Sequence, residues 1–192
     1  MCLRSAYGLC YLTYLCTPAT PRQHMITTRT LNPEKEAATY KAFFMQGLVA
    51  EPERFRISPA DEALAPFPTQ EGPESYTLGA FDGDQLVGVA SFERQGKDRE
   101  KLRHKGHLFR IYVAPTHRGR GIARQLILGI VERADAEPEI EQITLTAVAT
   151  NEKALALYGK LGFEVYGIEE NAIKYQGQSY TEAMMVLRMR EE

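Results

Sequence analysis

Residues 113–124 read Val-Ala-Pro-Thr-His-Arg-Gly-Arg-Gly-Ile-Ala-Arg, a glycine-rich turn that joins an apolar run to an amphipathic one. The preceding residues, 108–113, are typical of a strand, and apolar residues recur at helical spacing from Ile122 onward. Because Gly119 and Gly121 have no Cβ, the turn is free to direct its backbone N–H groups outward. A strand, a glycine turn and a helix in this order predict an anion-binding site at the start of the helix.

The charge of this segment fits a phosphate or pyrophosphate ligand. Arg118, Arg120 and Arg124 surround the two glycines. Their guanidinium groups stay charged at any physiological pH. We therefore expect them to add positive potential around the anion.

Two motifs resemble one known family. Arg118-x-x-Gly121-x-Ala123 matches the Q/R-x-x-G-x-G/A signature of the GCN5-related N-acetyltransferases (GNAT), which bind acetyl-CoA. Downstream, Asn151-x-x-Ala154-x-x-x-Tyr158-x-x-x-Gly162-Phe163 resembles the second motif of that family. The resemblance implies an acetyl-CoA-dependent N-acetyltransferase (EC 2.3.1.-) whose acceptor is a primary amine of a small molecule, a peptide or a protein.

Composition limits the other functional classes. The chain has 192 residues, 44% hydrophobic and 25% charged, with a net charge of −2, as in an ordinary globular domain. The absence of a basic surplus argues against a nucleic-acid partner. No apolar run is long enough to span a bilayer, so we expect no membrane partner and a cytoplasmic location. No Cys/His cluster has zinc-ligand spacing, and we expect no metal.

The first 24 residues differ from the remainder of the chain. They contain all three cysteines, Cys2, Cys10 and Cys16, so a disulfide framework does not hold the main domain together. A secretory signal, an additional element of the domain and an extension upstream of Met25 are three interpretations of this segment. We favour the extension, because periodic sequence begins directly after Met25. The acetyltransferase domain would then occupy residues 25–192.

The remaining sequence alternates between strand and helix patterns. Strands are expected over 25–31, 76–81, 86–92, 108–113, 143–149, 163–168 and 183–187, with helices after Asn32, near 60–64, over 122–134 and from Asn151 to about 161. A polar loop through Gly177 would precede the last strand. In the strand 108–113, alternation places Phe109, Ile111 and Val113 on one face and Leu108, Arg110 and Tyr112 on the other. The pattern predicts one α/β (α+β) domain, and the resemblance implies a mixed, mostly antiparallel sheet of six or seven strands flanked by helices.

The resemblance also implies which residues hold the cofactor. Backbone groups of a strand that separates from its parallel neighbour would pair with the pantetheine arm, and the glycine turn would hold the pyrophosphate. The cofactor-binding residues expected on this basis are Ile111, Tyr112, Val113, Arg118, Gly119, Arg120, Gly121, Ile122, Ala123 and Asn151.

Tyr158 is the expected general acid. It follows Asn151 by two helical turns, so both residues share one face of a helix. A phenol with an ordinary pKa of about 10 keeps its proton at neutral pH and can donate a hydrogen bond to a departing thiolate. The more common role of a tyrosine on an amphipathic helix is core packing, and the match to the family motif favours the catalytic role.

The general base and the acceptor remain open. Glu93, near the end of its strand, and His107, just before the central strand, are candidates for the base, although either is more often structural. His107 would share strand parity with Ile111 and Val113 if the pairing were regular. A domain that binds acyl-CoA without turnover is the alternative function. A homodimer is one option for the assembly.

Overall fold

A computed structural model describes residues 25–96 and 99–190 of the chain. The segment 1–24 lies outside the described residues, so its interpretation as an upstream extension stays a prediction. Within the described ranges, no helix is long and apolar enough to cross a membrane.

The described residues form one seven-stranded sheet in the order β1-β2-β3-β4-β5-β7-β6. Neighbouring strands are antiparallel except for β4 and β5, which run parallel. This confirms the expected mixed, mostly antiparallel sheet flanked by helices. The strands are β1 (Ile26–Thr30), β2 (Ser75–Asp82), β3 (Gln85–Arg94), β4 (Lys105–Val113), β5 (Gln142–Val148), β6 (Glu164–Tyr175) and β7 (Gln178–Arg188).

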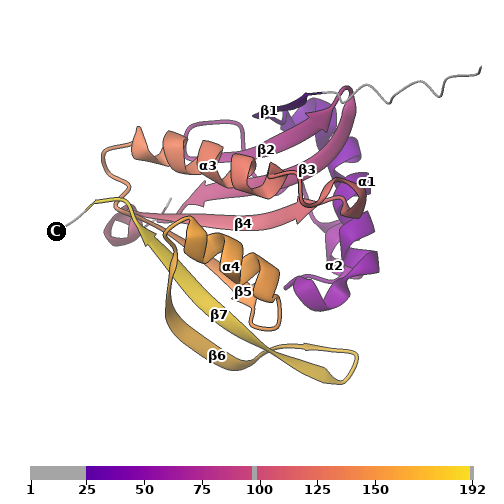
Figure 1. Ribbon diagram of the computed structural model, residues 1–192. Helices are drawn as coiled ribbons and strands as arrows, with labels where there is room; N and C mark the ends of the chain where they lie inside the picture. Colours follow the sequence, from indigo (N-terminus) through magenta and orange to yellow (C-terminus); the bar gives the residue numbers. More distant parts are fainter. Residues whose placement is uncertain (1–24, 97–98, 191–192) are drawn as a thin grey trace, which may run out of the picture.

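Helices cover both faces of the sheet (Figure 1). The apolar stripe of α3 packs with Tyr158 of α4 in a core that includes Leu126, Ile130 and Met185. On the other face, α1 packs Tyr40, Phe44 and Leu48 in a second, more aromatic core. The helices are α1 (Pro33–Ala50), α2 (Pro59–Leu64), α3 (Ile122–Asp135) and α4 (Glu152–Lys160), with short 3-10 turns η1 (Pro52–Arg54), η2 (Glu100–Leu102) and η3 (Pro115–His117).

Local signals for helix starts are confirmed. The Asn32 side chain accepts hydrogen bonds from the backbone N–H groups of Glu34 and Lys35, at 3.1 and 2.9 Å. Asn151 accepts one from Ala154 at 3.4 Å. Such caps satisfy N–H groups that have no partner within the helix, and each contributes roughly 1 kcal/mol to stability.

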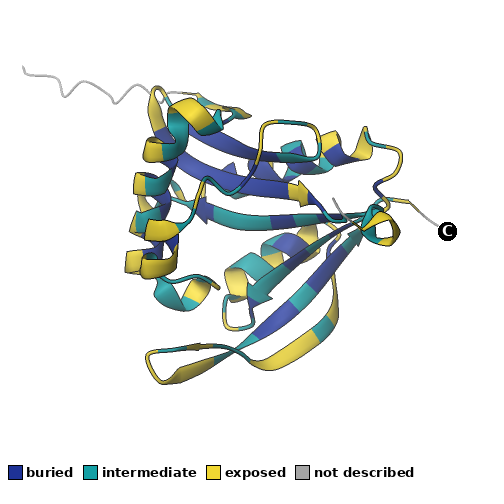
Figure 2. Cartoon of the chain, turned by 180° about the vertical axis from the view of Figure 1, so that it is seen from behind, coloured by how far each residue is buried: buried dark blue, intermediate teal, exposed yellow. Residues whose placement is uncertain are grey.

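The polar loop expected between Ile168 and Ala183 is wrong. This segment is strand on both sides of a tight turn at Gln176 and Gly177, where φ is +49° and +81°. β6 is the edge strand of the sheet and is largely exposed, as the yellow outer strand of the hairpin shows in Figure 2. Because neither face of this strand is fully buried, it tolerates polar residues and lacks the alternation that identifies a strand.

Candidate active site

The central strand β4 is interrupted by a bulge at Arg110. Residue Ser91 of β3 pairs with Phe109, and Val89 pairs with Tyr112, so two residues of β4 lie opposite Ala90. Arg110 has φ +52°, in the left-handed region that side chains seldom adopt. Because of this extra residue, side chains after Arg110 point to the opposite face of the sheet from the one that regular alternation predicts.

The expected face assignment of β4 is therefore wrong. Leu108 packs in the same core as Ile111 and Val113, whereas Tyr112 packs against α1 on the other face. His107 consequently does not share a face with Ile111 and Val113. The alternation rule failed because it assumes a regular strand on both sides of Arg110.

Beyond the bulge, β4 and β5 separate. Their parallel pairing is confined to three positions, the last of which joins His107 to Thr144. A cavity of about 940 Å³ opens between the two strands and is lined by residues from both helical layers. Its volume is in the range of small-molecule sites. Ten of the eleven predicted site residues line it: Ile111, Tyr112, Val113, Arg118, Gly119, Gly121, Ile122, Ala123, Asn151 and Tyr158.

The glycine turn leaves the start of α3 open. Gly119 and Gly121 both have φ +77°, and apart from the adjacent residues of the chain no atom lies within 4 Å of the position a Cβ would take at either. Gly121 is the N-cap residue and supplies no side-chain acceptor, whereas the caps of α1, α2 and α4 do. Among the four described α-helices, α3 alone starts without a side-chain cap, and its start borders the cavity. Its free N–H groups and positive dipole end suit an anion.

Two arginines of the turn form ion pairs within the fold. Arg118 donates two hydrogen bonds to Glu51, at 2.8 and 2.6 Å, and one to the carbonyl of Val113 at 3.0 Å. It thereby lowers the pKa of the Glu51 carboxyl. Arg120 pairs with Asp82 at 3.2 Å and does not line the cavity. Two of the three charges are therefore balanced within the fold, which the sequence could not show because Glu51 and Asp82 are distant in the chain.

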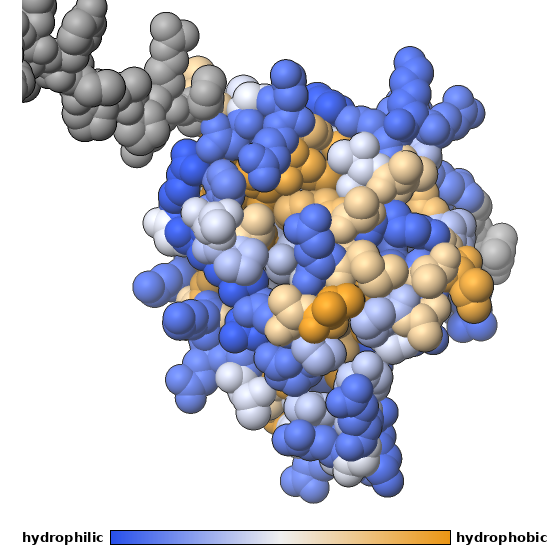
Figure 3. Space-filling view, turned by 90° about the vertical axis from the view of Figure 1, so that its right-hand side faces the viewer, coloured by the Kyte–Doolittle hydropathy of each residue, from blue (hydrophilic) through white to orange (hydrophobic). Residues whose placement is uncertain are grey.

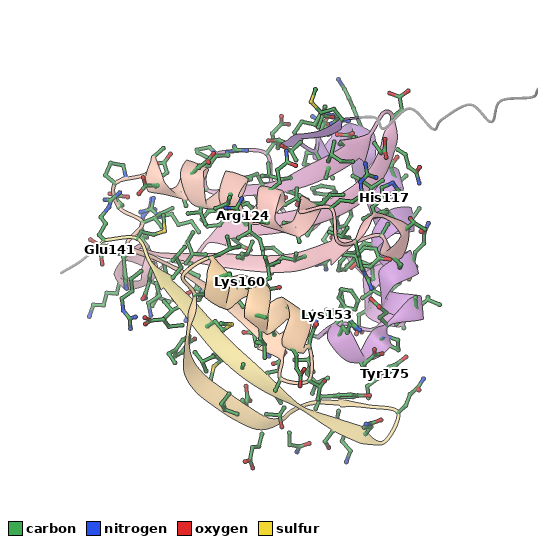
Figure 4. All side chains as sticks on the ribbon, viewed as in Figure 1. His117, Arg124, Glu141, Lys153, Lys160 and Tyr175 are labelled. Atoms are coloured by element: carbon green, nitrogen blue, oxygen red, sulfur yellow. The ribbon has the colours of Figure 1, made fainter. Side chains whose placement is uncertain are left out.

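Uncompensated positive charge comes instead from α3 and α4. Arg124, Lys153 and Lys160 line the cavity, are exposed, and have no ion pair within the described part of the chain. Figure 4 labels all three, Arg124 on α3 and the two lysines on α4. These cations can attract a polyanionic ligand to the start of α3.

Tyr158 lies on α4 between core and cavity. The residue is 8% exposed, and its ring meets Phe163 edge to face at 6.1 Å between centroids. Burial raises the pKa of Tyr158 to about 12. The phenol thus stays protonated at neutral pH and is available as a hydrogen-bond donor.

The two candidate bases lie opposite each other, Glu93 on β3 and His107 on β4, but only one of them lines the cavity. Glu93 is exposed on β3 and does not line the cavity, whereas His107 does. Burial lowers the pKa of His107, an effect that a hydrogen bond with Thr144 opposes and the charge of Arg56 enhances. His107 is thus a neutral imidazole at neutral pH, stacked against Phe109 at 5.5 Å.

A buried ion pair adjoins the bulge and was not foreseen. Arg110 Nη1 lies 2.7 Å from Glu62 Oε2, and it donates a hydrogen bond to the Tyr40 hydroxyl at 3.2 Å. Glu62 is fully buried, and this burial raises the pKa of its carboxyl against the opposing effect of Arg110. The pair joins α2 to the bulged residue of β4.

A second buried carboxylate, Glu182 of β7, lines the cavity itself. It lies opposite Val148 of β5, beyond the point where β4 and β5 separate. Its ion partner is Arg56, whose Nε is 3.2 Å from Glu182 Oε2 and whose side chain is 57% exposed. No sequence pattern points to Glu182, because the expected strand begins only at Ala183, whereas β7 begins at Gln178.

The end of the molecule that carries α1, α2 and the end of β4 has a mixed surface. Figure 3 shows apolar residues exposed there among hydrophilic ones.

With this geometry established, comparison with known proteins identifies the family. Residues 41–163 match the model of the Acetyltransferase (GNAT) family, and the chain belongs to that family. Among curated relatives, the chain is 40% identical to N-alpha-acetyltransferase MAK3 of Arabidopsis thaliana over 44% of this chain and 42% of that protein. It is 31% identical to N-alpha-acetyltransferase RimI of Mycobacterium tuberculosis over 57% of this chain and 65% of that protein. The chain thus spans less than two thirds of either relative.

Solved structures share the fold. The Salmonella typhimurium putative acetyltransferase yncA, solved with acetyl-CoA, superposes with a TM-score of 0.72 at 17% identity over 88% of this chain and 96% of that one. Arabidopsis thaliana NAA60, solved with a bisubstrate analogue, gives a TM-score of 0.68 at 19% identity over 86% of this chain and 100% of that one. At these identities the likeness establishes the fold.

Proposed function

We propose that this protein is an acetyl-CoA-dependent N-acetyltransferase that moves the acetyl group to a primary amine, with Tyr158 as general acid. The observation that carries the proposal is the cavity between the separating strands β4 and β5. It joins the uncapped start of α3, the backbone of β4 and the Tyr158 side chain in one space.

Cofactor binding uses the backbone more than side chains. In the proposal, the pyrophosphate lies on the N–H groups of residues 118–123, and Arg124, Lys153 and Lys160 supply attraction from the rim. The polar backbone groups of Ile111, Tyr112 and Val113 that face away from β3 pair with the pantetheine arm. Asn151 at the start of α4 completes the set.

The reaction then needs a nucleophile, a held carbonyl and a stabilised leaving group. The neutral amine nitrogen attacks the thioester carbon, so a C–N bond forms and the C–S bond breaks. Tyr158 donates a hydrogen bond to the developing thiolate, whose conjugate acid has a pKa of about 8.5. Because the phenol is the weaker acid, its main effect is stabilisation of negative charge on sulfur.

The acceptor differs among the relatives. MAK3 and RimI are named N-alpha-acetyltransferases, another relative from Escherichia coli is named L-amino acid N-acetyltransferase AaaT, and one from Trypanosoma brucei brucei acts on glucosamine 6-phosphate by its name. The acceptor is therefore proposed only as a primary amine, without a more specific class. The cytoplasmic location and the homodimer stay predictions.

Release of free CoA thiol from acetyl-CoA tests this function. The panel runs from ethanolamine and L-amino acids to glucosamine and a tetrapeptide with a free N-terminus. We expect thiol release that depends on one class of amine, with an N-acetyl product of matching mass. Acetyl-CoA binding without amine-dependent release would instead favour the non-catalytic acyl-CoA-binding module.

A further inference from the structure

Glu182 is a buried acid whose hydrogen-bonding capacity the fold does not use. Its side chain is 1% exposed, and neither carboxylate oxygen accepts a hydrogen bond from a described residue. Buried polar groups almost always have such partners, because leaving them without one costs roughly 2 kcal/mol or more. A carboxylate in this state at the wall of a cavity suggests that a ligand supplies the missing donors.

The ion pair with Arg56 does not replace those donors. Arg56 approaches one oxygen of Glu182 at 3.2 Å, and more than half of its side chain is exposed, so water screens its charge. The other charge acting on Glu182 is Glu169, its cross-strand neighbour on β6, which raises the pKa of the acid further after burial has done so. His107 and Arg110 line the same cavity from β4.

Glu182 lies on the face of the sheet opposite α3 and α4, and this face is the side from which the acceptor would enter. Along β7, Met185 packs in the core beneath α3 and α4, so Glu182, three residues earlier, points to the opposite face. Arg56, from the segment that follows η1, meets it on that face. The start of α3 and Tyr158, which hold the cofactor in the proposed function, belong to the other layer of the same cavity.

An ammonium group can supply the hydrogen-bond donors that the Glu182 carboxylate lacks. Neither carboxylate oxygen accepts a hydrogen bond, and only Oε2 has an ion partner, the largely exposed Arg56. An ammonium, with three N–H donors and one positive charge, matches this site. In the described part of the chain, no group of three His, Cys, Asp or Glu residues gathers to hold a metal ion. One carboxylate would be a poor site for a divalent cation, which takes several oxygen ligands.

We propose that Glu182 binds the ammonium group of the acceptor and takes its proton before the amine attacks the thioester. The inference rests on the proposed function. One proton passes from the ammonium to the Glu182 carboxylate and on to water. The neutral amine then forms the C–N bond as the C–S bond breaks, and the second proton of the nitrogen ends on the CoA sulfur. An acceptor that has no ionisable amine would not use this subsite.

The test compares Glu182→Gln with Glu170→Gln, an exposed acid of β6 that loses the same charge. With the best amine of the panel, we expect kcat/KM to fall at least a hundredfold in Glu182→Gln and to stay within threefold in Glu170→Gln, as general-base contributions are about a hundredfold or more. Glu182→Asp, which keeps a carboxylate, should recover part of the loss.

The pH profile separates a catalytic role from a structural one. In the parent, kcat/KM should level off near neutral pH, because Glu182 deprotonates the ammonium form of the acceptor. In Glu182→Gln only the neutral amine reacts, so kcat/KM should keep rising towards the pKa of the amine. The melting temperature at pH 8 should not fall, since Gln removes a buried charge.

Three results would overturn the inference. The first is a Glu182→Gln enzyme with the same pH profile of kcat/KM as the parent, and the second is a kcat/KM within threefold of the parent. The third is a melting temperature several degrees below that of the parent, as expected if Glu182 only forms a structural ion pair with Arg56. An active parent with an equally active variant would remove this inference alone. A parent that acetylates no amine would remove the proposed function and the inference with it.

Discussion

Arg110 Nη1 and Glu62 Oε2 lie 2.7 Å apart, so the bulged residue of β4 is tied to the short helix α2. Arg110 has φ +52°, a conformation that costs about 1 kcal/mol or more and persists only where the surroundings hold it. The same bulge directs Ile111 and Val113 to the core beneath α3 and α4. The ion pair therefore helps to fix the part of β4 that borders the cavity.

Removing the arginine should cost stability. Arg110→Leu leaves the Glu62 carboxylate buried without its cation, and we expect the free energy of unfolding to fall by about 3 kcal/mol. The double variant Arg110→Leu/Glu62→Leu should lose less than the sum of the two single changes. Urea unfolding measures all three, and Arg188→Leu, from the exposed pair with Glu164, should cost less than about 1 kcal/mol. Additive losses would show that the two groups are not coupled.

A β-branched side chain at the glycine turn should abolish cofactor binding. Gly121→Val places a Cβ at φ +77° and projects it towards the expected pyrophosphate, so acetyl-CoA should no longer raise the melting temperature. Gly177→Val is the matched control, since Gly177 has φ +81° in open space at the hairpin tip. It should lose similar stability yet keep the acetyl-CoA effect. Equal behaviour of the two variants would mean that strain alone explains the loss.

The three exposed cations that line the cavity should set the salt dependence of acetyl-CoA binding, whereas Arg120 should not. The triple variant Arg124→Gln/Lys153→Gln/Lys160→Gln should raise the Kd for acetyl-CoA by roughly tenfold, on the basis of about 0.5 kcal/mol per exposed charge. Titration calorimetry at two salt concentrations measures this. Arg120→Gln should change the Kd by less than about twofold, because Arg120 pairs with Asp82 outside the cavity. A stronger effect of Arg120 would contradict this assignment.

Tyr158→Phe should lower turnover and retain affinity. The change removes one hydroxyl and keeps the ring that packs against Phe163, so kcat should fall by at least roughly tenfold while the Kd for acetyl-CoA changes by less than about threefold. Because the pKa of Tyr158 is about 12, its ionisation should not lower the parent rate below pH 10. A kcat within about twofold of the parent, where chemistry limits the rate, would make Tyr158 a packing residue.

The sequence identified features that depend on nearby residues. The helix caps at Asn32 and Asn151 and the glycine turn at Gly119 and Gly121 follow from backbone requirements within a few positions, and they were predicted correctly. The bulge at Arg110 could not be predicted, because it is defined by the register with β3.

Features that depend on contacts between distant residues could not be predicted from the sequence. The burial of Glu62 and Glu182 results from packing between elements far apart in the chain, and both read as ordinary acidic residues. The pairing of Arg118 with Glu51 could not be predicted either, because it depends on how the end of α1 lies relative to the glycine turn.

The central claim is that the cavity between β4 and β5 holds acetyl-CoA, and thermal melting with and without acetyl-CoA tests it most directly. At a hundredfold excess over Kd, a ligand that binds only the native state adds about 2.7 kcal/mol. For a chain of this size we expect the melting temperature to rise by roughly 5–10 °C. An unchanged melting temperature at millimolar acetyl-CoA would contradict the claim.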